Sequence, residues 1–269
     1  MRADCEPFEL LAIRYARHSG RRPHDNYMGH VDLHDAGSDL AYYVWVARRS
    51  DCTYVIDTGF DEPAARQRGR ELLLSVREGL ALAGVDATRV QNVILTHLHY
   101  DHAGTLEQFP HAHFHVQDAE AAYASGRSMS HPFMRAPYDV ENIVAFIRKL
   151  YDGRVVFHQG DSELTAGLSL HWVGGHTAGL QIVRVWTRRG WVVLASDAAH
   201  LYGNFQHGVP FPIAHNLSDM LEGHRRALAL ADSPDHVIPG HDPLVMERYP
   251  AYSPESENRV VRLDADCLR

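Results

Sequence analysis

Four apolar stretches of the sequence each end in a side chain that can bind a metal ion. They precede His97, His176, Asp197 and His241. A strand that carries a donor at its end fixes that side chain on a rigid scaffold, and several strand ends at one edge of a sheet can converge on one site. This recurrence predicts a metal site assembled from distant parts of the chain.

The densest group of donors lies in THLHYDHAG, residues 96–104, which contains His97, His99, Asp101 and His102. In an extended segment His97 and His99 point to the same side, because side chains alternate with a period of two. Imidazole and carboxylate donors together suit zinc and neighbouring first-row metals, whereas calcium prefers oxygen donors. A polar turn that is merely rich in histidine is the alternative, since the chain has 20 histidines. Four donors so close together favour a metal site.

The segment THLHYDHAG resembles the HxHxDH motif of the metallo-β-lactamase-fold hydrolases. The later donors follow in that family's order, with His176 in GGHTAG, Asp197 in ASDAAH and His241 in PGHD. Together with the segment VIDTG around Asp57, the pattern is most similar to the N-acyl-homoserine lactonase branch. The resemblance implies an α/β fold of the αββα sandwich type, with two central sheets between layers of helices.

The resemblance also implies a role for each donor. Two groups of three would each hold one Zn²⁺ ion: His97, His99 and His176 for the first, and Asp101, His102 and His241 for the second. Asp197 would bridge the two ions, and other first-row divalent metals suit the same donors. Asp57 would accept a hydrogen bond from a ligand imidazole and fix its tautomer. On local sequence alone, Asp57 is equally well explained as a turn residue after a strand.

Two neighbouring metal ions would supply hydrolytic chemistry. They can share a water, lower its pKa towards neutrality and hold the resulting hydroxide as a nucleophile, while one ion polarises a substrate carbonyl. This chemistry would open an N-acyl-homoserine lactone or a related lactone or ester. Asp101 is the candidate for moving a proton from the attacking water to the departing oxygen, a role that is compatible with metal ligation.

One position departs from the lactonase pattern. Those enzymes usually carry a tyrosine three residues after the bridging aspartate, where its phenol contacts the substrate carbonyl. In this sequence that position is His200, and Tyr202 follows two residues later. Either His200 or Tyr202 is therefore a candidate catalytic donor to the substrate, and the preferred substrate within the lactone class is left open.

Three other classes of protein share much of this donor set. A thioesterase of the glyoxalase II type and a mononuclear-iron sulfur dioxygenase are the enzymatic alternatives. No glutathione-binding tail is evident, because only 28 residues (269 minus 241) follow His241. A non-catalytic metal-binding protein of the same fold would be expected to lose donors, whereas all seven are present. The sequence therefore favours a metal-dependent hydrolase.

The segment SGRSMSHPFMRAPYDV, residues 125–140, is the candidate wall of the substrate pocket. Its glycine, serine and proline content predicts a loop, and Phe133, Met134 and Tyr138 predict that this loop covers something apolar. Phe205 would extend the wall from a later segment. The alternative is a loop that packs onto the core without touching substrate.

Alternating strand and helix patterns predict mixed α and β layers in one domain over residues 1–269. Strands are expected at 41–47, 53–56, 92–96, 113–116, 155–157, 168–173, 181–186 and 191–195. Helices are expected at 62–83, 117–124 and 218–231, the first of them ended by Gly84.

Charge and termini limit the classes of partner. The net charge of −8 argues against a nucleic-acid binder, and the arginine pairs at 21–22, 48–49 and 188–189 are interpreted as solvated loop charges. The sequence has no signal-peptide pattern and no stretch apolar enough to span a bilayer, so no membrane partner is expected. The three cysteines, too few for a disulfide framework, favour a reducing compartment and a cytoplasmic enzyme that acts on a small molecule. Whether two chains form a homodimer is left open.

Overall fold

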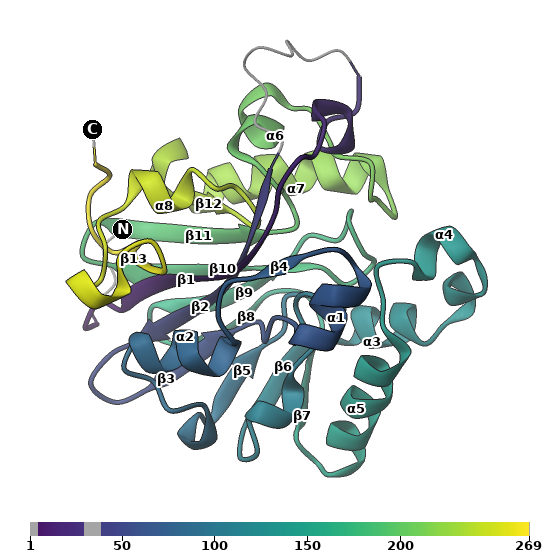
Figure 1. Cartoon of the computed structure of the whole chain (residues 1–269), viewed down its shortest axis with the longest axis horizontal. Helices are drawn as coiled ribbons and strands as arrows, with labels where there is room; N and C mark the ends of the chain where they lie inside the picture. The colour runs from purple at the N-terminus through teal and green to yellow at the C-terminus, as the bar shows by residue number, and fades with distance from the viewer. Residues whose placement is uncertain (1–4, 30–38, 269) are drawn as a thin grey trace.

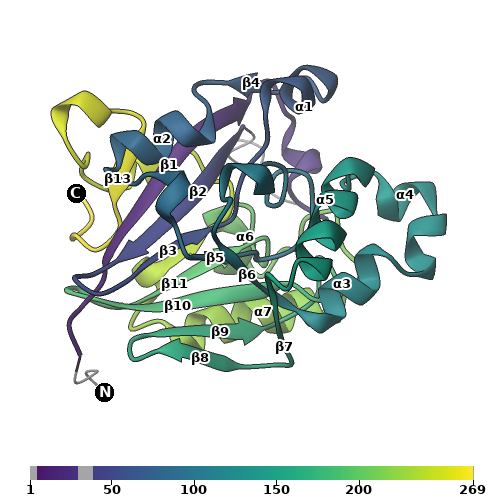
Figure 2. The same cartoon turned by 90° about the horizontal axis from the view of Figure 1, so that it is seen from below.

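Two β-sheets lie face to face in the computed structural model, which describes residues 5–29 and 39–268 (Figure 1). The first sheet has the strand order β13-β1-β2-β3-β5-β6-β7, with β4 beside β1, and the second has the order β12-β11-β10-β9-β8. Helices α1, α2, α3 and α5 cover the outer side of the first sheet, and α6, α7 and α8 cover that of the second (Figures 1 and 2). This layering confirms the predicted α/β class and αββα sandwich.

The strands match the sequence expectations closely. The first sheet contains β1 (Glu9–His18), β2 (Leu40–Arg48), β3 (Thr53–Ile56), β4 (Glu71–Leu72), β5 (Asn92–Ile94), β6 (His113–Gln117), β7 (Val155–His158) and β13 (Val260–Arg262). The second contains β8 (Ser162–Thr165), β9 (Leu168–Trp172), β10 (Gln181–Thr187), β11 (Gly190–Ser196) and β12 (Val237–Pro239). All the predicted strands are present, and their ends differ from the expectation by two residues at most.

The helices are mostly short. They are α1 (Glu62–Gln67), α2 (Val76–Leu82), α3 (Asp118–Ala124), α4 (Pro132–Arg135), α5 (Val140–Tyr151), α6 (Tyr202–His207), α7 (Leu217–Leu230) and α8 (Val245–Arg248). The predicted helices at 117–124 and 218–231 correspond to α3 and α7. Within the described part of the chain, no helix is both long and apolar enough to cross a membrane.

The first sheet is buried on both faces. In β2, Tyr43 and Trp45 belong to the core between the two sheets, whereas the alternating Val44 and Val46 belong to the core beneath the helices. Trp45 is fully buried, so its replacement by alanine would cost about 3–5 kcal/mol of unfolding free energy. Because both faces are covered, β1 and β2 show almost continuous apolar sequence instead of a strict alternation. Because a strict alternation is absent, β1 was not among the predicted strands.

The predicted helix over 62–83 is wrong, because the structure divides it into α1 and α2. Gly69 follows α1 with a φ of +63°, a left-handed conformation that favours glycine. Ser75 then caps α2, accepting a hydrogen bond from the backbone N–H of Glu78 while the Glu78 carboxylate accepts one from the Ser75 N–H. This capping box starts a new helix inside the apolar repeat. Gly84, with a φ of +71°, follows the end of α2 as expected.

Candidate metal centre

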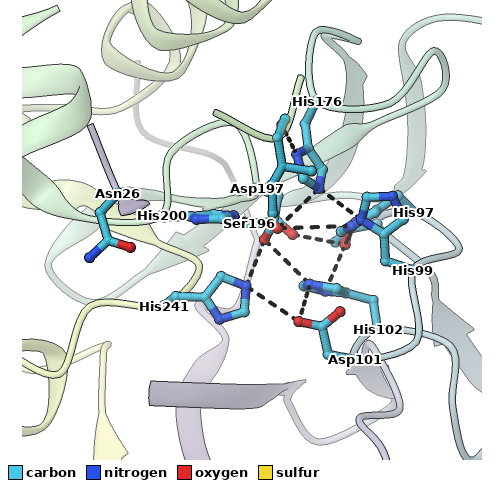
Figure 3. A network of polar contacts seen from close by, with 12 residues as sticks. Asn26, His97, His99, Asp101, His102, His176, Ser196, Asp197, His200 and His241 are labelled. Atoms are coloured by element: carbon cyan, nitrogen blue, oxygen red, sulfur yellow. Dashed lines mark hydrogen bonds and ion pairs between the residues drawn. The ribbon is translucent and has the colours of Figure 1, made fainter. Parts of the chain in front are cut away.

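The loops after β5, β9, β11 and β12 meet at one end of the sandwich and bring the predicted donors together. Figure 3 shows the seven side chains turned toward one another: His97, His99, Asp101, His102, His176, Asp197 and His241. Each loop follows a buried strand, so the donors are held on the rigid core. The expected convergence of strand ends is what the structure displays.

The first group of donors surrounds one oxygen of Asp197. The ligating atoms of His97, His99 and His176 all lie within 4.8 Å of one another. Nδ1 of His99 lies 2.9 Å from Nε2 of His176, and Nε2 of His176 lies 3.2 Å from Oδ2 of Asp197. Nε2 of His97 lies 4.0 Å from the same oxygen. Three imidazoles and one carboxylate oxygen therefore face a common point.

The second group surrounds the other oxygen of Asp197. Oδ1 of Asp197 lies 3.3 Å from Nε2 of His102 and 3.0 Å from Nε2 of His241. Oδ2 of Asp101 lies 3.7 Å from the same atom of His102 and 3.8 Å from that of His241. One carboxylate thus turns an oxygen to each group, which is the arrangement that a bridging ligand requires.

Several buried atoms in this cluster lack the hydrogen bonds that their burial demands. Among the described residues, Nε2 of His97, Nε2 of His102 and Oδ1 of Asp197 have no hydrogen-bond partner. Nε2 of His102 and Oδ1 of Asp197 are close, but they are not aligned for a hydrogen bond. An unpaired buried polar atom costs about 1–3 kcal/mol, and a metal ion relieves that cost at all three atoms. The donor set fits two divalent metal ions.

Hydrogen bonds behind the donors fix the orientation of the imidazoles. His102 donates from Nδ1 to Oδ2 of Asp57 at 2.7 Å, so Asp57 occupies the expected place behind a candidate ligand. His176 and His241 donate from Nδ1 to the backbone carbonyls of Ile213 (2.7 Å) and Ala41 (2.9 Å). In each case Nε2 keeps its lone pair and faces the centre.

Backbone geometry supports the position of Asp197. Ser196, at the end of β11, has a φ of +44°, an uncommon conformation for a residue other than glycine. A Cβ atom on Gly240 would lie 2.7 Å from the Ser196 carbonyl oxygen and 2.8 Å from Oδ1 of Asp197, so only glycine fits there. The sharp turn after β11 and the bare backbone before His241 bring the two donors together.

The electrostatics of the cluster favour a cation beside Asp197. Burial opposes a charge on Asp197, but the surrounding histidines, His241 first, hold the pKa of its carboxyl well below its usual value. Burial lowers the pKa of His97, so its imidazole is neutral and able to bind metal. Burial also opposes a charge on His102, yet Asp197 and Asp57 hold the pKa of His102 well above its usual value. That side of the centre attracts positive charge, whether a proton or a metal ion.

The two candidate catalytic donors occupy different environments. Nε2 of His200 lies 2.9 Å from Oδ2 of Asp197, and its ring stacks on Phe211 at a centroid distance of 3.5 Å. Tyr202 instead points into the apolar core, with the Arg248 guanidinium of α8 4.0 Å from its ring centre. Phe205 packs beside Tyr202 in the same core. The structure therefore brings His200 to the centre and leaves Tyr202 and Phe205 away from it, because both belong to the apolar side of α6.

A cavity of about 240 Å³ opens onto the donors, and its outer wall includes Phe133, which is 68% exposed. The other two expected wall residues have different contacts. Tyr138 is buried, and its ring lies at a steep angle to that of His99 with a centroid distance of 4.5 Å. Its hydroxyl donates a hydrogen bond to Glu120 at 3.1 Å. Met134 accepts one at its sulfur from the Tyr123 hydroxyl at 3.5 Å. Of the three residues expected in 125–140, only Phe133 lines this cavity, and the segment contains a 3₁₀ turn and α4 instead of a plain loop.

Glu120 is a buried carboxylate that sequence analysis did not identify. It accepts hydrogen bonds from the backbone N–H groups of Leu98 (3.0 Å) and Gly179 (3.1 Å), and so links the two loops that carry His99 and His176. A Cβ atom on Gly179 would overlap the Glu120 backbone, which explains the glycine. The only local signal is a glutamate among the small apolar residues of α3, and such a pattern does not reveal its partners.

Arg21 is also placed differently from the expectation. Instead of a solvated loop charge, it lines the cavity together with Arg68 and Arg70 and is only partly exposed. Its guanidinium donates to Oδ1 of Asn26 at 2.8 and 3.0 Å, and this contact holds it against the fold. Burial of a loop residue depends on what packs over it, and the pair of arginines at 21–22 contains no such information.

Comparison with curated proteins identifies two kinds of relative. An N-acyl homoserine lactonase of a Bacillus species is 26% identical over 188 residues, which cover 64% of this chain and 70% of that protein. A probable metallo-hydrolase of Mycobacterium tuberculosis is 26% identical over 247 residues, which cover 77% of this chain and 76% of that protein.

Solved structures match over nearly the whole chain. An N-acyl homoserine lactone hydrolase with the product N-hexanoyl-L-homoserine at its catalytic metal centre has a TM-score of 0.73 at 21% identity, covering 92% of this chain and 98% of that one. A dizinc quorum-quenching lactonase has a TM-score of 0.66 at 18% identity, covering 89% and 90%. These matches establish the fold. The family model described as the metallo-beta-lactamase superfamily matches residues 37–244, and this chain therefore belongs to that superfamily.

Proposed function

We propose that this superfamily member is a dinuclear zinc hydrolase that opens a lactone or a related carboxylic ester. The observation that carries the proposal is the position of Asp197, whose two oxygens face separate groups of three donors at the floor of a cavity. The likeness to N-acyl homoserine lactonases supports the ester class of substrate. When bound, paired zinc ions lower the pKa of a water ligand and polarise a carbonyl oxygen.

Asp101 is suited to move the proton. Its carboxylate lines the cavity beside His102 and His241, so it can accept a proton from the attacking water and deliver it to the departing ring oxygen. A carboxylate that also contacts a metal can serve both purposes. Asp101 thus combines ligation with proton transfer in this proposal.

His200 is suited to hold Asp197 in place. Its contact to Oδ2 at 2.9 Å directs the ring nitrogen at the carboxylate, and stacking on Phe211 keeps the imidazole from turning. Tyr202 cannot replace the tyrosine that donates to the substrate carbonyl in the lactonases, because it lies in the core, whereas the tyrosines that line the cavity are Tyr42 and Tyr100 from other segments. We therefore assign His200 a positioning role through Asp197, and its replacement by asparagine should lower kcat more than it raises KM.

The proposal is tested by metal content together with a hydrolysis panel. Metal-replete protein is offered acyl-homoserine lactones of several lengths, simple γ- and δ-lactones, aryl esters and S-lactoylglutathione. We expect two zinc equivalents per chain and turnover of at least one lactone. Preference for the thioester, or one iron per chain with oxygen consumption, would replace the proposal with the glyoxalase II or dioxygenase class.

A pair of matched variants connects activity to the cluster. His99→Ala removes a donor and should abolish metal binding in the first group together with turnover. His113→Ala removes an exposed histidine on β6 and should change neither. Full activity in His99→Ala would contradict the assignment.

A further inference from the structure

Three arginines share the cavity with the candidate metal centre. Arg21 follows β1, whereas Arg68 and Arg70 lie between α1 and β4, and all three line the cavity that also contains Asp101 and His200. The chain carries a net charge of −8, so this concentration of positive charge is a local feature. It faces the place where a substrate would enter.

These three guanidinium groups have no carboxylate partner within 4.0 Å among the residues that the structure describes. Nearby arginines do, since Arg17 pairs with Glu71 and Arg66 pairs with Glu62, each at 2.8 Å. The cavity arginines donate to neutral acceptors instead, such as Oδ1 of Asn26 for Arg21 and the hydroxyl of Tyr100 for Arg70 at 3.1 Å. Within the described part of the chain, their positive charges are therefore not paired directly with a carboxylate.

His18 holds two of the guanidinium groups close together. Its Nδ1 lies 3.4 Å from Nη1 of Arg21, and its Nε2 lies 3.2 Å from Nη1 of Arg70. Burial and these two cations lower the pKa of His18 to about 4, so the imidazole is neutral near pH 7. A neutral imidazole accepts at one nitrogen only, and it cannot satisfy both arginines. The positively charged Arg21 and Arg70 therefore lie side by side, and His18 can accept a hydrogen bond from only one of them.

The main alternative is that the arginines only support the wall. This explanation fits Arg68, which donates to the backbone carbonyls of Ala136 and Tyr138 at 3.0 Å each and lies 3.9 Å from the centre of the Tyr100 ring. It does not account for Arg70, whose Nη2 donates to none of the described residues. A guanidinium whose Nη2 group is unused in a cavity is suited to donate a charge-assisted hydrogen bond to an oxyanion.

Building on the proposed hydrolase function, we propose that Arg21 and Arg70 bind an oxyanion group of the substrate, a carboxylate or a phosphate. The substrate is then an anionic lactone or ester, and the charged group lies at the arginines while the scissile carbonyl lies at the metal centre. The cavity of about 240 Å³ can hold a compact molecule of this kind.

The test compares three γ-butyrolactones that differ only at the γ carbon. One carries a carboxylate, one a phosphorylated hydroxymethyl group and one an uncharged carboxamide. In metal-replete wild-type protein, kcat/KM for at least one oxyanion lactone should exceed that for the carboxamide by about tenfold or more. The two charged substrates distinguish a carboxylate site from a phosphate site.

Variants identify the groups responsible. Arg70→Gln and Arg21→Gln should each remove most of the preference, because they raise KM for the charged lactone much more than they affect the carboxamide. Arg66→Gln is the matched control, because Arg66 is exposed on α1 and pairs with Glu62; it should change neither rate. The carboxamide rate also reports whether each variant is folded.

The outcomes separate this inference from the function on which it rests. If the carboxamide is opened as fast as both charged lactones, the inference is overturned and the hydrolase function stands. Equal losses on charged and uncharged substrates in both arginine variants would assign the arginines a structural role and would also overturn it. If no lactone is opened by protein with two bound metal ions, the proposed function itself fails.

Discussion

The floor of the cavity, formed by the candidate metal donors, and its wall, which includes Phe133 and the three arginines, are built in different ways. Each floor imidazole follows a buried strand and most are held from behind by a second hydrogen bond, as His102 is by Asp57 and His241 is by the Ala41 carbonyl. The outer part of the wall includes exposed or partly exposed groups, such as Phe133 on α4 and the three arginines. The floor therefore has little freedom to change, whereas the wall can vary without disturbing it.

The floor and the wall therefore have different roles, because the floor determines the reaction and the wall determines which substrates bind. The floor supplies what any superfamily hydrolase needs, namely donors at fixed positions, and bound metal would relieve its cost in unpaired buried atoms. The wall presents an aromatic ring and three guanidinium groups to whatever enters. Changes to the floor should alter turnover and metal content, and changes to the wall should alter KM and substrate preference.

The largest effect is expected from Asp101→Asn. The amide cannot accept the proton from the attacking water, so kcat should fall by about 10²–10⁴ at saturating zinc. Metal content and lactone turnover are measured on the same sample, and Asp118→Asn, an exposed carboxylate on α3, is the control. Unchanged kcat with both metals bound would exclude Asp101 as the proton carrier.

Asp57→Asn should weaken the floor from behind. Replacing the acceptor for His102 Nδ1–H removes the bond that fixes the imidazole tautomer, and the affinity for metal in the second group should fall by about 10–100-fold. Competition with a chelator measures this affinity. An affinity equal to that of the wild type would mean that Thr96, which donates to Asp57 at 2.7 and 2.8 Å, matters more than His102 as its partner.

Glu120→Gln tests the connection between floor and wall. Oε1 of Glu120 accepts from Leu98 N–H on the floor and from the Tyr138 hydroxyl behind the wall, while Oε2 accepts from Gly179 N–H. A glutamine amide would turn its NH₂ group toward one of these two sets of donors. The free energy of unfolding should fall by about 1–3 kcal/mol in urea denaturation. Glu163→Gln, on the exposed side of β8, should have no effect. If the two variants had the same free energy of unfolding, the hydrogen bonds of Glu120 would not contribute measurably to stability.

The smallest effect is expected from Phe133→Ala. The ring is 68% exposed, so removing it takes away only part of an apolar contact, worth about 1 kcal/mol or roughly fivefold in KM. The kcat and metal content should not change. Phe157→Ala on β7 is the control, since Phe157 is similarly exposed and does not line the cavity. A large fall in kcat would show that Phe133 contributes to the catalytic step and not only to substrate binding.

The same division explains which features the sequence could predict. His97, His99, Asp101 and His102 lie in one short segment, and their spacing alone restricts how they can point. The later donors follow apolar stretches that are recognisable as strands. Local order therefore indicated the donors, whereas the place of Asp57 followed from the family resemblance and not from local sequence.

The wall depends on contacts between distant segments, which local patterns do not record. Tyr202 has a suitable chemical group, but it begins α6 on the side that packs against the core, so its hydroxyl does not reach the cavity. Arg21 belongs to a pair of charges typical of solvated loops and is nevertheless held beside His18 in the cavity. In both cases tertiary packing decided the orientation.

Anomalous scattering from crystals grown with ample zinc would locate the metal ions themselves. We expect two zinc ions in each chain, one among His97, His99 and His176 and the other among Asp101, His102 and His241, with an oxygen of Asp197 directed at each. Fewer than two ions at full zinc loading, or donor side chains turned away from one another, would contradict this expectation.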